Sequence, residues 1–401
     1  MSDPEVKDIR KQLSWKRIII PILLGLAAAT YLLIHNLNGH TFMEAKPGEG
    51  GAFYNWVDGN GNNIVDRSVD RDFEFVAHGT FIKKSTIQLL REIHWDTAAT
   101  MALLGALLMV ALRDFGYVFR IRAMTDKQLS WKQSFEVIML WEFASSLTPS
   151  VVGGSSIAMF IINREGINMG KSTAITFVTA MLDEIFYILM VPIIFLIIGS
   201  ASLFPQSWVA DQFGTNSIKI LFLIGYFFIV LLTAIILIGI FWRPNWFKTT
   251  LVWITSFSVM KRLQRRAIRV GDEIIITSQE LRGKSIGYWL KPFLATCMSW
   301  TARFFTLNFI LLIFVKDFDH LLVYGRQLVM WVIMLISPTP GGSGIAELAL
   351  ANFFDYLMPL GLLAIVAIIW RLLTYFPYLF IGAIILPRWW KRTAVAGNGT
   401  N

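Results

Sequence analysis

The sequence has 401 residues, of which 55% are apolar and only 16% are charged, and its mean hydropathy is +0.57. Soluble globular proteins carry about 25% charged residues, so this composition argues against a soluble enzyme and favours a polytopic membrane protein. The net charge of +9 does not indicate nucleic-acid binding, because lysines and arginines flank apolar segments and form no basic domain. Anionic lipid is the expected partner. The single cysteine, Cys297, excludes an intrachain disulfide, and no metal or cofactor is expected.

Apolar segments long enough to cross a bilayer as helices recur along the chain. The first follows Lys16 and Arg17 and also fits a signal peptide, but we interpret it as an uncleaved span. We therefore predict an all-α helical bundle with about six full spans. These are Ile18–Leu33, Thr97–Leu112, Thr173–Ile198, Ile220–Trp242, Tyr288–Val315 and Gly361–Leu386.

Two other apolar regions, Phe135–Ile162 and Leu328–Leu357, contain Pro and Gly at their midpoints. A helix broken in lipid leaves backbone groups unpaired, and this is tolerated only where protein or water surrounds the break. Each region is therefore predicted to be a re-entrant hairpin of two half-helices.

Most of the 36 lysine and arginine residues fall in segments that this scheme places on one side of the membrane. Positive residues favour the cytoplasm, so both termini are predicted to be cytoplasmic. Residues 1–17 form the N-terminal segment, 18–387 the transmembrane domain and 388–401 the tail. Within the domain, 37–96 is an external loop and 243–287 a basic cytoplasmic loop. Trp389 and Trp390, followed by Lys391 and Arg392, are typical of interfacial anchors.

The two predicted hairpins carry similar tips, Thr148–Ala158 and Ser337–Ala346, each with Pro followed by Gly-Gly-Ser-x-Ile-Ala. Because the hairpins are predicted to enter from opposite faces, the pattern predicts an inverted repeat, which marks transporter binding sites. A broken helix turns amide groups and its positive end towards an anion such as phosphate. The alternative is that Gly and Ser only allow close helix packing. The tip residues predicted to bind substrate are Thr148, Pro149, Gly153, Gly154, Thr339, Pro340, Gly341, Gly342 and Ser343.

Ionisable residues inside apolar segments complete the predicted site. Charges at membrane depth are costly and usually face a cavity or a partner. Arg303 and Arg371 are predicted to hold a lipid phosphate, together with Glu347 and Tyr375. Glu347, Asp183 and Glu184 are predicted to be counter-charges or proton carriers. The alternative is that these residues form structural ion pairs that lock the bundle.

The motifs Thr148-Pro149 with Gly153-Gly154, Pro338–Glu347, and Arg371 with Thr374 resemble those of a flippase-like family. The family is typified by the transmembrane half of bacterial lysylphosphatidylglycerol synthases, and the segment Asp114–Arg122 is similar to its smaller members. The resemblance covers roughly residues 15–390 and implies a bacterial inner-membrane protein that translocates lipid or a polyprenyl-linked amphiphile. Few polar residues follow Trp390, so we expect no aminoacyl-transfer domain.

Three functional interpretations remain open. A transporter requires a cavity in which Arg303 and Arg371 converge. A lipid-modifying transferase requires a metal-binding acidic motif or a nucleophile at a membrane face, and the sequence offers neither, so no enzymatic activity is expected. The third is a non-transporting partner of a lipid or envelope synthesis enzyme. A second copy of the chain and a separate cytoplasmic enzyme are the protein partners considered.

Overall fold

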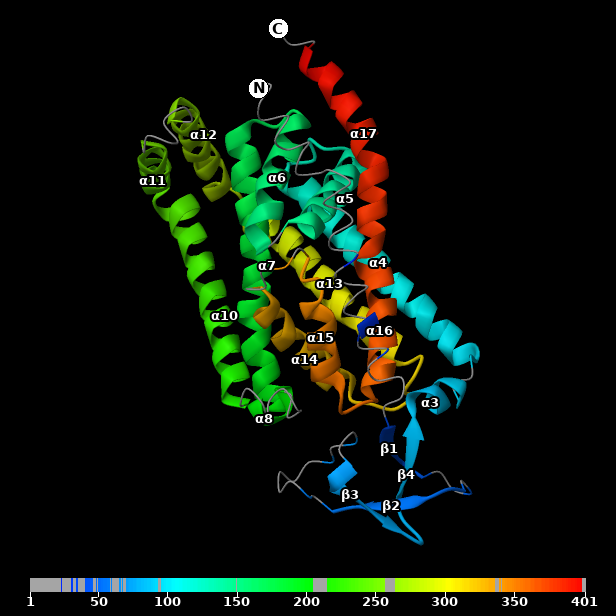
Figure 1. Cartoon of the computed structure of the whole chain (residues 1–401). Helices are drawn as coiled ribbons and strands as arrows, with labels where there is room; N and C mark the ends of the chain where they lie inside the picture. The colour runs from blue at the N-terminus through cyan, green and yellow to red at the C-terminus, as the bar shows by residue number, and fades with distance from the viewer. Residues whose placement is uncertain are drawn as a thin grey trace.

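The structure is a computed structural model that describes residues 23, 30, 31, 34, 40–45, 48, 50–57, 59, 65, 67, 70–92, 95–148, 150–204, 215–256, 264–335, 339 and 341–398. Most of these residues are helical, and a small sheet lies at one end of the helical body (Figure 1). The predicted class, a polytopic helical membrane protein, is confirmed. Residues 1–17 and 399–401 and most of the predicted span Ile18–Leu33 lie outside the described residues.

Four helical segments in the described part are long and apolar enough to cross a membrane. They are α4 (Thr97–Met124), α7 (Met169–Ile198), α10 (Thr215–Ile236) with the π-helical turn η2 (Leu237–Trp242), and α16 (Leu360–Thr374) with α17 (Phe376–Asn398). The 28 residues of α4 measure about 42 Å at 1.5 Å per residue, more than a hydrocarbon core of about 30 Å. These segments coincide with four of the predicted spans, and the total of six stays a prediction.

Helix α13 (Ile286–Leu311) covers most of a fifth predicted span and packs antiparallel to α4 along its length. The two backbones approach closely at glycines of α4. A Cβ atom on Gly116 would lie 2.1 Å from the Ser299 hydroxyl, and one on Gly105 would lie 2.6 Å from the Phe309 ring. Small residues allow such contacts between membrane helices. The α4–α13 pair is the central support on which the hairpins pack.

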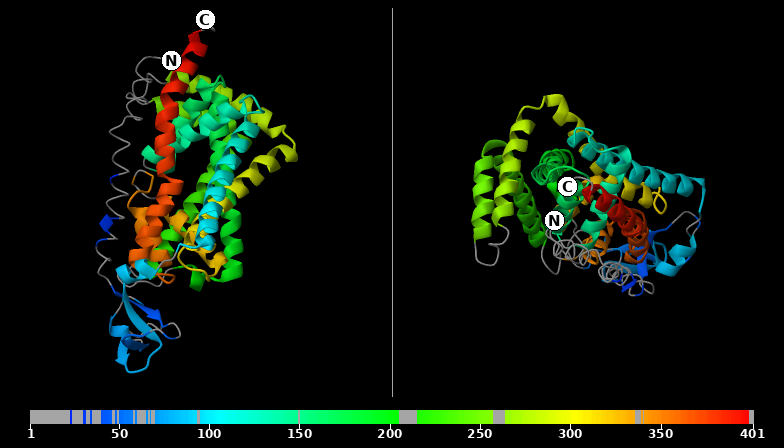
Figure 2. Two further views of the ribbon diagram at one scale, coloured as in Figure 1. Left: turned by 90° about the vertical axis from the view of Figure 1, so that its right-hand side faces the viewer. Right: turned by 90° about the horizontal axis from the view of Figure 1, so that it is seen from above.

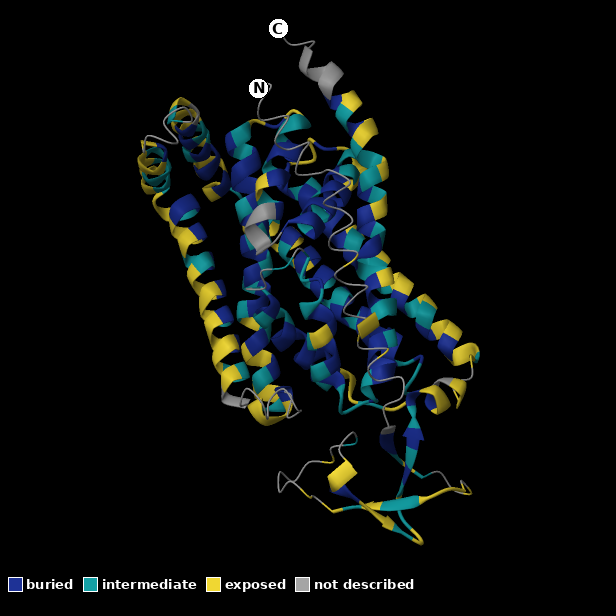
Figure 3. Cartoon of the chain, in the orientation of Figure 1, coloured by how far each residue is buried: buried dark blue, intermediate teal, exposed yellow. Residues whose placement is uncertain are grey.

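The helices differ in how far they are buried (Figure 3). Helix α10 is exposed along much of its length, with large apolar side chains such as Leu223 and Phe227 at 60% and 66% exposure. Helices α14 (His320–Met334) and α15 (Ile345–Phe354) belong instead to the main apolar core. An exposed apolar face suits contact with lipid tails, so α10 lies at the lipid-facing edge of the bundle.

Both predicted hairpins consist of two helices separated by a break. The first contains α5 (Trp131–Leu147) and α6 (Ser150–Arg164), and the second contains α14 and α15. Helix α5 begins with a capping box, in which Ser130 and Gln133 satisfy each other's amide groups. The hairpins occupy opposite halves of the helical body (Figure 1). The inverted symmetry between them stays a prediction.

The predicted last span, Gly361–Leu386, is not one continuous helix. Helix α16 ends at Thr374, Tyr375 leaves the helical conformation with φ −133° and ψ −60°, and α17 begins at Phe376. Pro377 explains the break, because it has no amide hydrogen to donate to the preceding turn and its ring clashes with that turn. The break places the Tyr375 side chain at the centre of the bundle.

The boundary predicted for the second span was also wrong. The span was predicted to end at Leu112, but α4 continues to Met124 and buries Arg113 and Arg120 at 1% and 4% exposure. These arginines are tolerated because aromatic rings and carboxylates surround them.

Part of the loop 37–96 forms an antiparallel sheet, a feature absent from the all-α prediction. Its strands are β1 (His40–Glu44), β2 (Phe53–Trp56), β3 (Phe73–Val76) and β4 (Phe81–Ser85), in the order β1-β4-β2-β3. The turn η1 (Asp70–Asp72) precedes β3, and the helix α3 (Thr86–Glu92) follows β4. The rings of Phe42 and Phe73 stack at 4.0 Å in its small core.

The helices α11 (Pro244–Ser256) and α12 (Gln264–Arg282) form an antiparallel pair at the end of the body opposite the sheet, the same end towards which α17 runs (Figures 1 and 2). Helix α12 packs on the start of α7, where the Glu273 carboxylate accepts the Gly170 amide at 2.6 Å. A short helix, α8 (Ser200–Leu203), follows α7. The segments predicted to be external and cytoplasmic therefore gather at opposite ends, as a spanning protein requires.

Candidate functional site

A cavity of about 200 Å³ lies where the broken ends of the two hairpins meet α13, α16 and the α16–α17 break. Seven of the predicted site residues line it: Thr148, Arg303, Thr339, Gly341, Gly342, Arg371 and Tyr375. The others are Glu142, Ser145, Ser146, Trp331, Met334, Leu335, Trp370 and Thr374. The two membrane arginines thus converge on one cavity, as the transporter interpretation requires.

The first hairpin reaches the cavity with hydroxyl groups at the end of α5. Thr148 is the last residue before the break, and its hydroxyl donates to the Ala144 carbonyl at 2.9 Å. Ser146 donates to the Glu142 carbonyl at 2.8 Å. Gly154 allows α6 to cross α5 closely, since a Cβ atom there would lie 2.2 Å from the Ser145 hydroxyl. Gly154 therefore shapes the tip and does not line the cavity.

The two prolines of the predicted set, Pro149 in the first tip and Pro340 in the second, lie outside the described residues. Gly153 lies in the first turn of α6. The close packing of small residues, which was the alternative interpretation of the motif, thus accounts for Gly154.

The second tip is a tight turn that depends on glycine. Gly341, Gly342 and Gly344 have φ values of +57°, +66° and +86°, a region that other residues rarely adopt. A Cβ atom on Gly341 would also lie 2.4 Å from the Tyr375 ring. The turn therefore brings backbone carbonyl groups against the side chains of α16.

Arg371 and Glu347 hold this turn in place. The Arg371 Nε donates to Glu347 Oε1 at 2.8 Å, and its two terminal nitrogens donate to the Gly341 and Gly342 carbonyls at 3.2 and 3.3 Å. Glu347 Oε2 accepts the Gly344 amide at 2.7 Å. Both side chains are buried, at 7% and 1% exposure. Arg371 is thus fully engaged as a structural ion pair, and Glu347 lies behind the cavity wall.

Tyr375 connects the two hairpin tips. Its hydroxyl donates to the Ser146 carbonyl of the first tip at 2.9 Å and accepts from the Ser343 hydroxyl of the second at 3.3 Å. The Arg371 guanidinium lies 4.6 Å from the centre of its ring. A movement of either tip therefore requires these contacts to change.

Arg303 differs from Arg371 in having a weak partner. Its guanidinium lies 4.8 and 5.1 Å from the ring centres of Trp300 and Trp331, and its nearest carboxylate contact is 3.6 Å, to Glu142 Oε1. Its Nε is buried and has no hydrogen-bond partner in the described part of the chain. Unused donors on a cation that lines a cavity are suited to bind an anion.

Glu142 lines the cavity and pairs with Arg113, which is not a lining residue, and neither was predicted to belong to the site. Glu142 lies between two cations, because its Oε2 is 2.8 Å from Arg113 while its Oε1 faces Arg303. Arg113 lies over the Tyr378 ring at 4.6 Å, and the Tyr378 hydroxyl donates to Asp114 at 2.9 Å. Glu142 was detectable as a carboxylate inside the first apolar hairpin, Phe135–Ile162. Arg113 was missed because the span was predicted to end at Leu112.

Asp183 and Glu184, the predicted counter-charges, do not line the cavity. Asp183 accepts two hydrogen bonds from Arg120 at 2.5 and 3.2 Å and one from the Trp300 indole at 2.8 Å. Asp183 therefore forms a structural ion pair with Arg120. Glu184 is buried at 5% exposure and forms none of these contacts.

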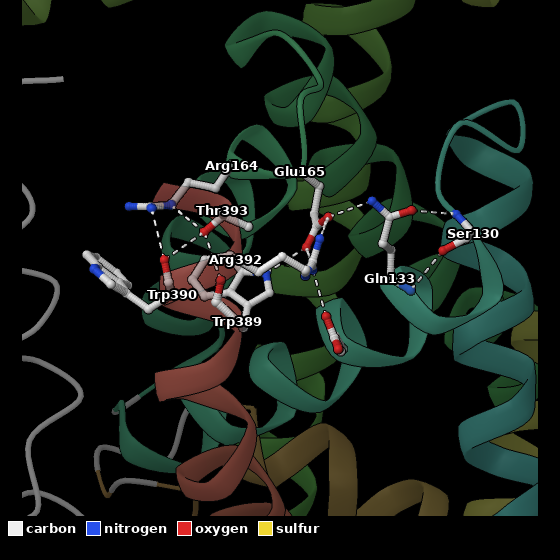
Figure 4. A network of polar contacts seen from close by, with 9 residues as sticks. Ser130, Gln133, Arg164, Glu165, Trp389, Trp390, Arg392 and Thr393 are labelled. Carbon is white, nitrogen blue, oxygen red and sulfur yellow. Dashed lines mark hydrogen bonds and ion pairs between the residues drawn. The ribbon is translucent and has the colours of Figure 1, made fainter. Parts of the chain in front are cut away.

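A second polar network links α17 to the first hairpin through residues that do not line the cavity (Figure 4). Glu165, just after α6, accepts the Trp389 indole at 2.7 Å, Gln133 at 2.9 Å and Arg392. Arg164 donates to Thr393 at 3.0 Å. Trp389 is only 1% exposed, so the prediction of an interfacial anchor at this residue was wrong. The Trp389 indole instead hydrogen-bonds to Glu165, just after the second helix of the hairpin.

Comparison with known proteins places the chain in a family. Residues 79–382 match the family described as the lysylphosphatidylglycerol synthase TM region, a match over more than half of the chain. The chain belongs to this family. The match includes both hairpins and every cavity-lining residue, whereas strands β1 to β3 precede it.

Within the described residues, no group of three or more His, Cys, Asp or Glu side chains is arranged to hold a metal.

A curated relative shows the same membrane character. A UPF0104 membrane protein of Archaeoglobus fulgidus is 28% identical over 269 residues, which cover 64% of this chain and 76% of the relative. No solved structure matches the chain. The family and this relative together support a multi-pass membrane protein.

Proposed function

We propose that this protein moves a phospholipid or a lipid-linked amphiphile across the membrane, and that the anionic headgroup passes through the cavity between the hairpin tips. The observation that carries the proposal is the position of Arg303. It is a membrane-buried cation that lines a cavity, lies over two tryptophan rings and has a buried donor without a partner.

The cavity wall suits a polar headgroup attached to apolar chains. Hydroxyl groups of Ser145, Ser146, Thr148 and Thr374 supply polar surface, although the last three donate to backbone carbonyls within their own helices. Trp331 and Trp370 supply apolar surface. Ligand sites combine apolar walls with a few convergent polar groups in this way. The headgroup would replace Glu142 as the partner of Arg303, because the existing contact of 3.6 Å is long for a charged hydrogen bond.

The two tips supply a route for movement. They come from hairpins in opposite halves of the body and touch at the cavity through Tyr375. Separation of one tip from Tyr375 would open the cavity towards one side of the membrane, and separation of the other would open it towards the opposite side. This use of paired broken helices is the general principle of alternating access. We place the protein in a bacterial inner membrane with both termini in the cytoplasm.

The role we assign is transport without chemistry on the lipid. A lipid-modifying transferase and a non-transporting partner of a synthesis enzyme are the competing interpretations. They are distinguished by whether the pure protein alone moves lipid.

The test is translocation of fluorescent phospholipids and polyprenyl phosphates by the purified protein in liposomes. Wild type is compared with Arg303→Ala and, as a matched control, with Lys316→Ala, which removes a cation that is 78% exposed. We expect movement of at least one lipid class by wild type and the control, and a loss of about tenfold or more in Arg303→Ala, since a charged hydrogen bond contributes about 1.5–3 kcal/mol. Absence of movement with every lipid would contradict the proposal.

A further inference from the structure

Glu184 is an isolated carboxyl group in the middle of α7, one of the spanning helices. Its side chain is buried, and its Oε2 atom has no hydrogen-bond partner in the described part of the chain. No ion pair to Glu184 is formed there either. An ionised carboxylate without a partner is far more costly to bury than a neutral carboxyl group.

The other carboxylates of the described membrane helices, whether buried or partly buried, have cations nearby. Glu347 pairs with Arg371 at 2.8 Å, Asp183 with Arg120 at 2.5 Å, and Glu142 with Arg113 at 2.8 Å. Asp114 lies 3.8 Å from Arg113 and accepts the Tyr378 hydroxyl. Glu184 is thus the exception among buried carboxyl groups of the described membrane helices.

The helices around α7 bring no cation to Glu184. Arg326 of α14 donates to the Ser202 and Phe353 carbonyls, and Arg303 of α13 faces Glu142. Lys219 lies over Phe204 at the far end of α10. Other titratable groups of α7 and the elements packed on it are Lys171, Asp183 and Tyr187 of α7, Tyr226 of α10, Arg164 of α6, His320 and Tyr324 of α14, Tyr288, Lys291 and Cys297 of α13, and Arg265, Arg266, Arg269, Asp272, Glu273, Glu280 and Arg282 of α12.

Of these groups, Asp183 is the nearest charge along the helix. Its two oxygens are occupied by Arg120 and Trp300. A negative charge on Glu184 would lie next to that of Asp183, and no cation in the described part of the chain pairs with Glu184 itself, which favours the neutral form further.

We propose that Glu184 is a proton-binding site inside the membrane, and that its proton drives headgroup translocation. This inference rests on the proposed function and adds the energy source. During a cycle, the carboxylate binds a proton from water on one side and releases it to the other, with no covalent step. We assign the protonated state to Glu184 in this structure, because its buried Oε2 has no partner in the described part of the chain.

A chain of contacts links this proton site to the cavity. Trp300 donates its indole hydrogen to Asp183, next to Glu184, and its ring lies 4.8 Å from the Arg303 guanidinium. The charge on Glu184 changes the repulsion at Asp183, and any shift of Asp183 moves the indole that supports Arg303. Proton binding and headgroup binding therefore act on one side chain.

The proton site is tested first without any lipid transport. Infrared difference spectra of the full-length protein in nanodiscs are recorded while the pH is raised from neutral, for wild type, Glu184→Gln and Glu74→Gln. Glu74 is exposed on the external sheet and serves as the matched control. We expect a carboxylic-acid carbonyl band in wild type and in the control that is absent from Glu184→Gln. A spectrum that is identical in wild type and Glu184→Gln would overturn the proton site.

Coupling is tested in liposomes with and without a pH gradient. We expect the gradient to accelerate phospholipid translocation several-fold in wild type and in Glu74→Gln, with equal rates in Glu184→Gln whether or not the gradient is present. Glu184→Asp should restore part of the acceleration, which a purely structural role would not produce. Full acceleration in Glu184→Gln would overturn coupling. If wild type moves no lipid while the infrared band is present, the proposed function fails and the proton site stands.

Discussion

The two hairpins have similar tips but use their charged residues differently. At the second tip, Arg371 and Glu347 form a short, buried pair that also binds the backbone of the turn. At the first tip, Glu142 lies on α5 before the break, and its contact with Arg303 is long, at 3.6 Å. A buried pair with every donor satisfied fixes one geometry, whereas a long contact with an unpaired donor can be replaced by a ligand. We therefore propose a structural role for Arg371 and substrate contact for Arg303.

The largest effect is expected from breaking the tight pair. Arg371→Ala leaves the Glu347 carboxylate buried without a cation, which costs about 3–5 kcal/mol. The loss is measured as a lower midpoint of thermal unfolding in detergent. The double variant Arg371→Met with Glu347→Leu removes both charges and should recover much of the stability. A midpoint unchanged by Arg371→Ala would contradict the structural role.

Arg303 variants should separate activity from stability. We expect Arg303→Ala to reduce translocation about tenfold or more, because charged hydrogen bonds contribute about 1.5–3 kcal/mol, with a smaller change in unfolding midpoint than Arg371→Ala. Arg303→Lys keeps the charge but loses the flat guanidinium that lies over Trp300 and Trp331, so it should restore activity only in part. Rates and midpoints measured on the same preparations check both expectations. A larger drop in midpoint for Arg303→Ala than for Arg371→Ala would reverse the assignment.

The contact between the tips should have an intermediate effect. Tyr375→Phe removes a hydroxyl that bonds Ser146 and Ser343 and should cost about 1 kcal/mol of stability. Because the hydroxyl joins the tips, the same variant should change the translocation rate more than Trp389→Phe does. Trp389→Phe serves as the matched control, since it removes an indole bond to Glu165 far from the cavity. Equal effects of the two variants on the rate would show that the Tyr375 link plays no part in movement.

The sequence predicted the two helix breaks and the two membrane arginines, but it did not predict the different roles of the arginines. Pro and Gly in the middle of apolar segments located both breaks. A helix can be interrupted inside a membrane only where protein or a water-filled cavity surrounds the break, so these residues are informative there. Arg303 and Arg371 were predicted correctly to share a cavity. Which arginine is paired could not be predicted, because that depends on how Glu142 and Glu347 are brought near them by separate helices.

Other features were missed for physical reasons that differ. Arg113 and Arg120 were placed beyond the predicted end of the second span at Leu112, since a sequence does not reveal that Tyr117 and nearby carboxylates surround them. The break at Tyr375 had a signal in Pro377, which a strongly apolar segment obscured. The sheet was missed because its strands have only four or five residues and lie between turns.

The smallest effect is expected at the exposed pair of Asp96 and Lys316, far from the cavity. Lys316 and the Ala99 amide donate to the Asp96 carboxylate and lower its pKa. The lowered pKa stabilises the fold above the ordinary carboxyl range, and this contribution is lost as pH falls through the lowered value. Melting temperatures of wild type and Asp96→Asn should therefore differ slightly at neutral pH and converge in acid. A difference that grows in acid would contradict the pairing.

The most direct test of the central claim is whether lipid occupies the cavity beside Arg303. Thr374 lines the cavity, so Thr374→Cys in a Cys297→Ser background places one thiol there. The rate of labelling by a water-soluble thiol reagent is measured with and without anionic phospholipid. We predict that the lipid slows labelling, and that this protection disappears when Arg303→Ala is added. Protection that persists without Arg303, or labelling that lipid never slows, would contradict the account.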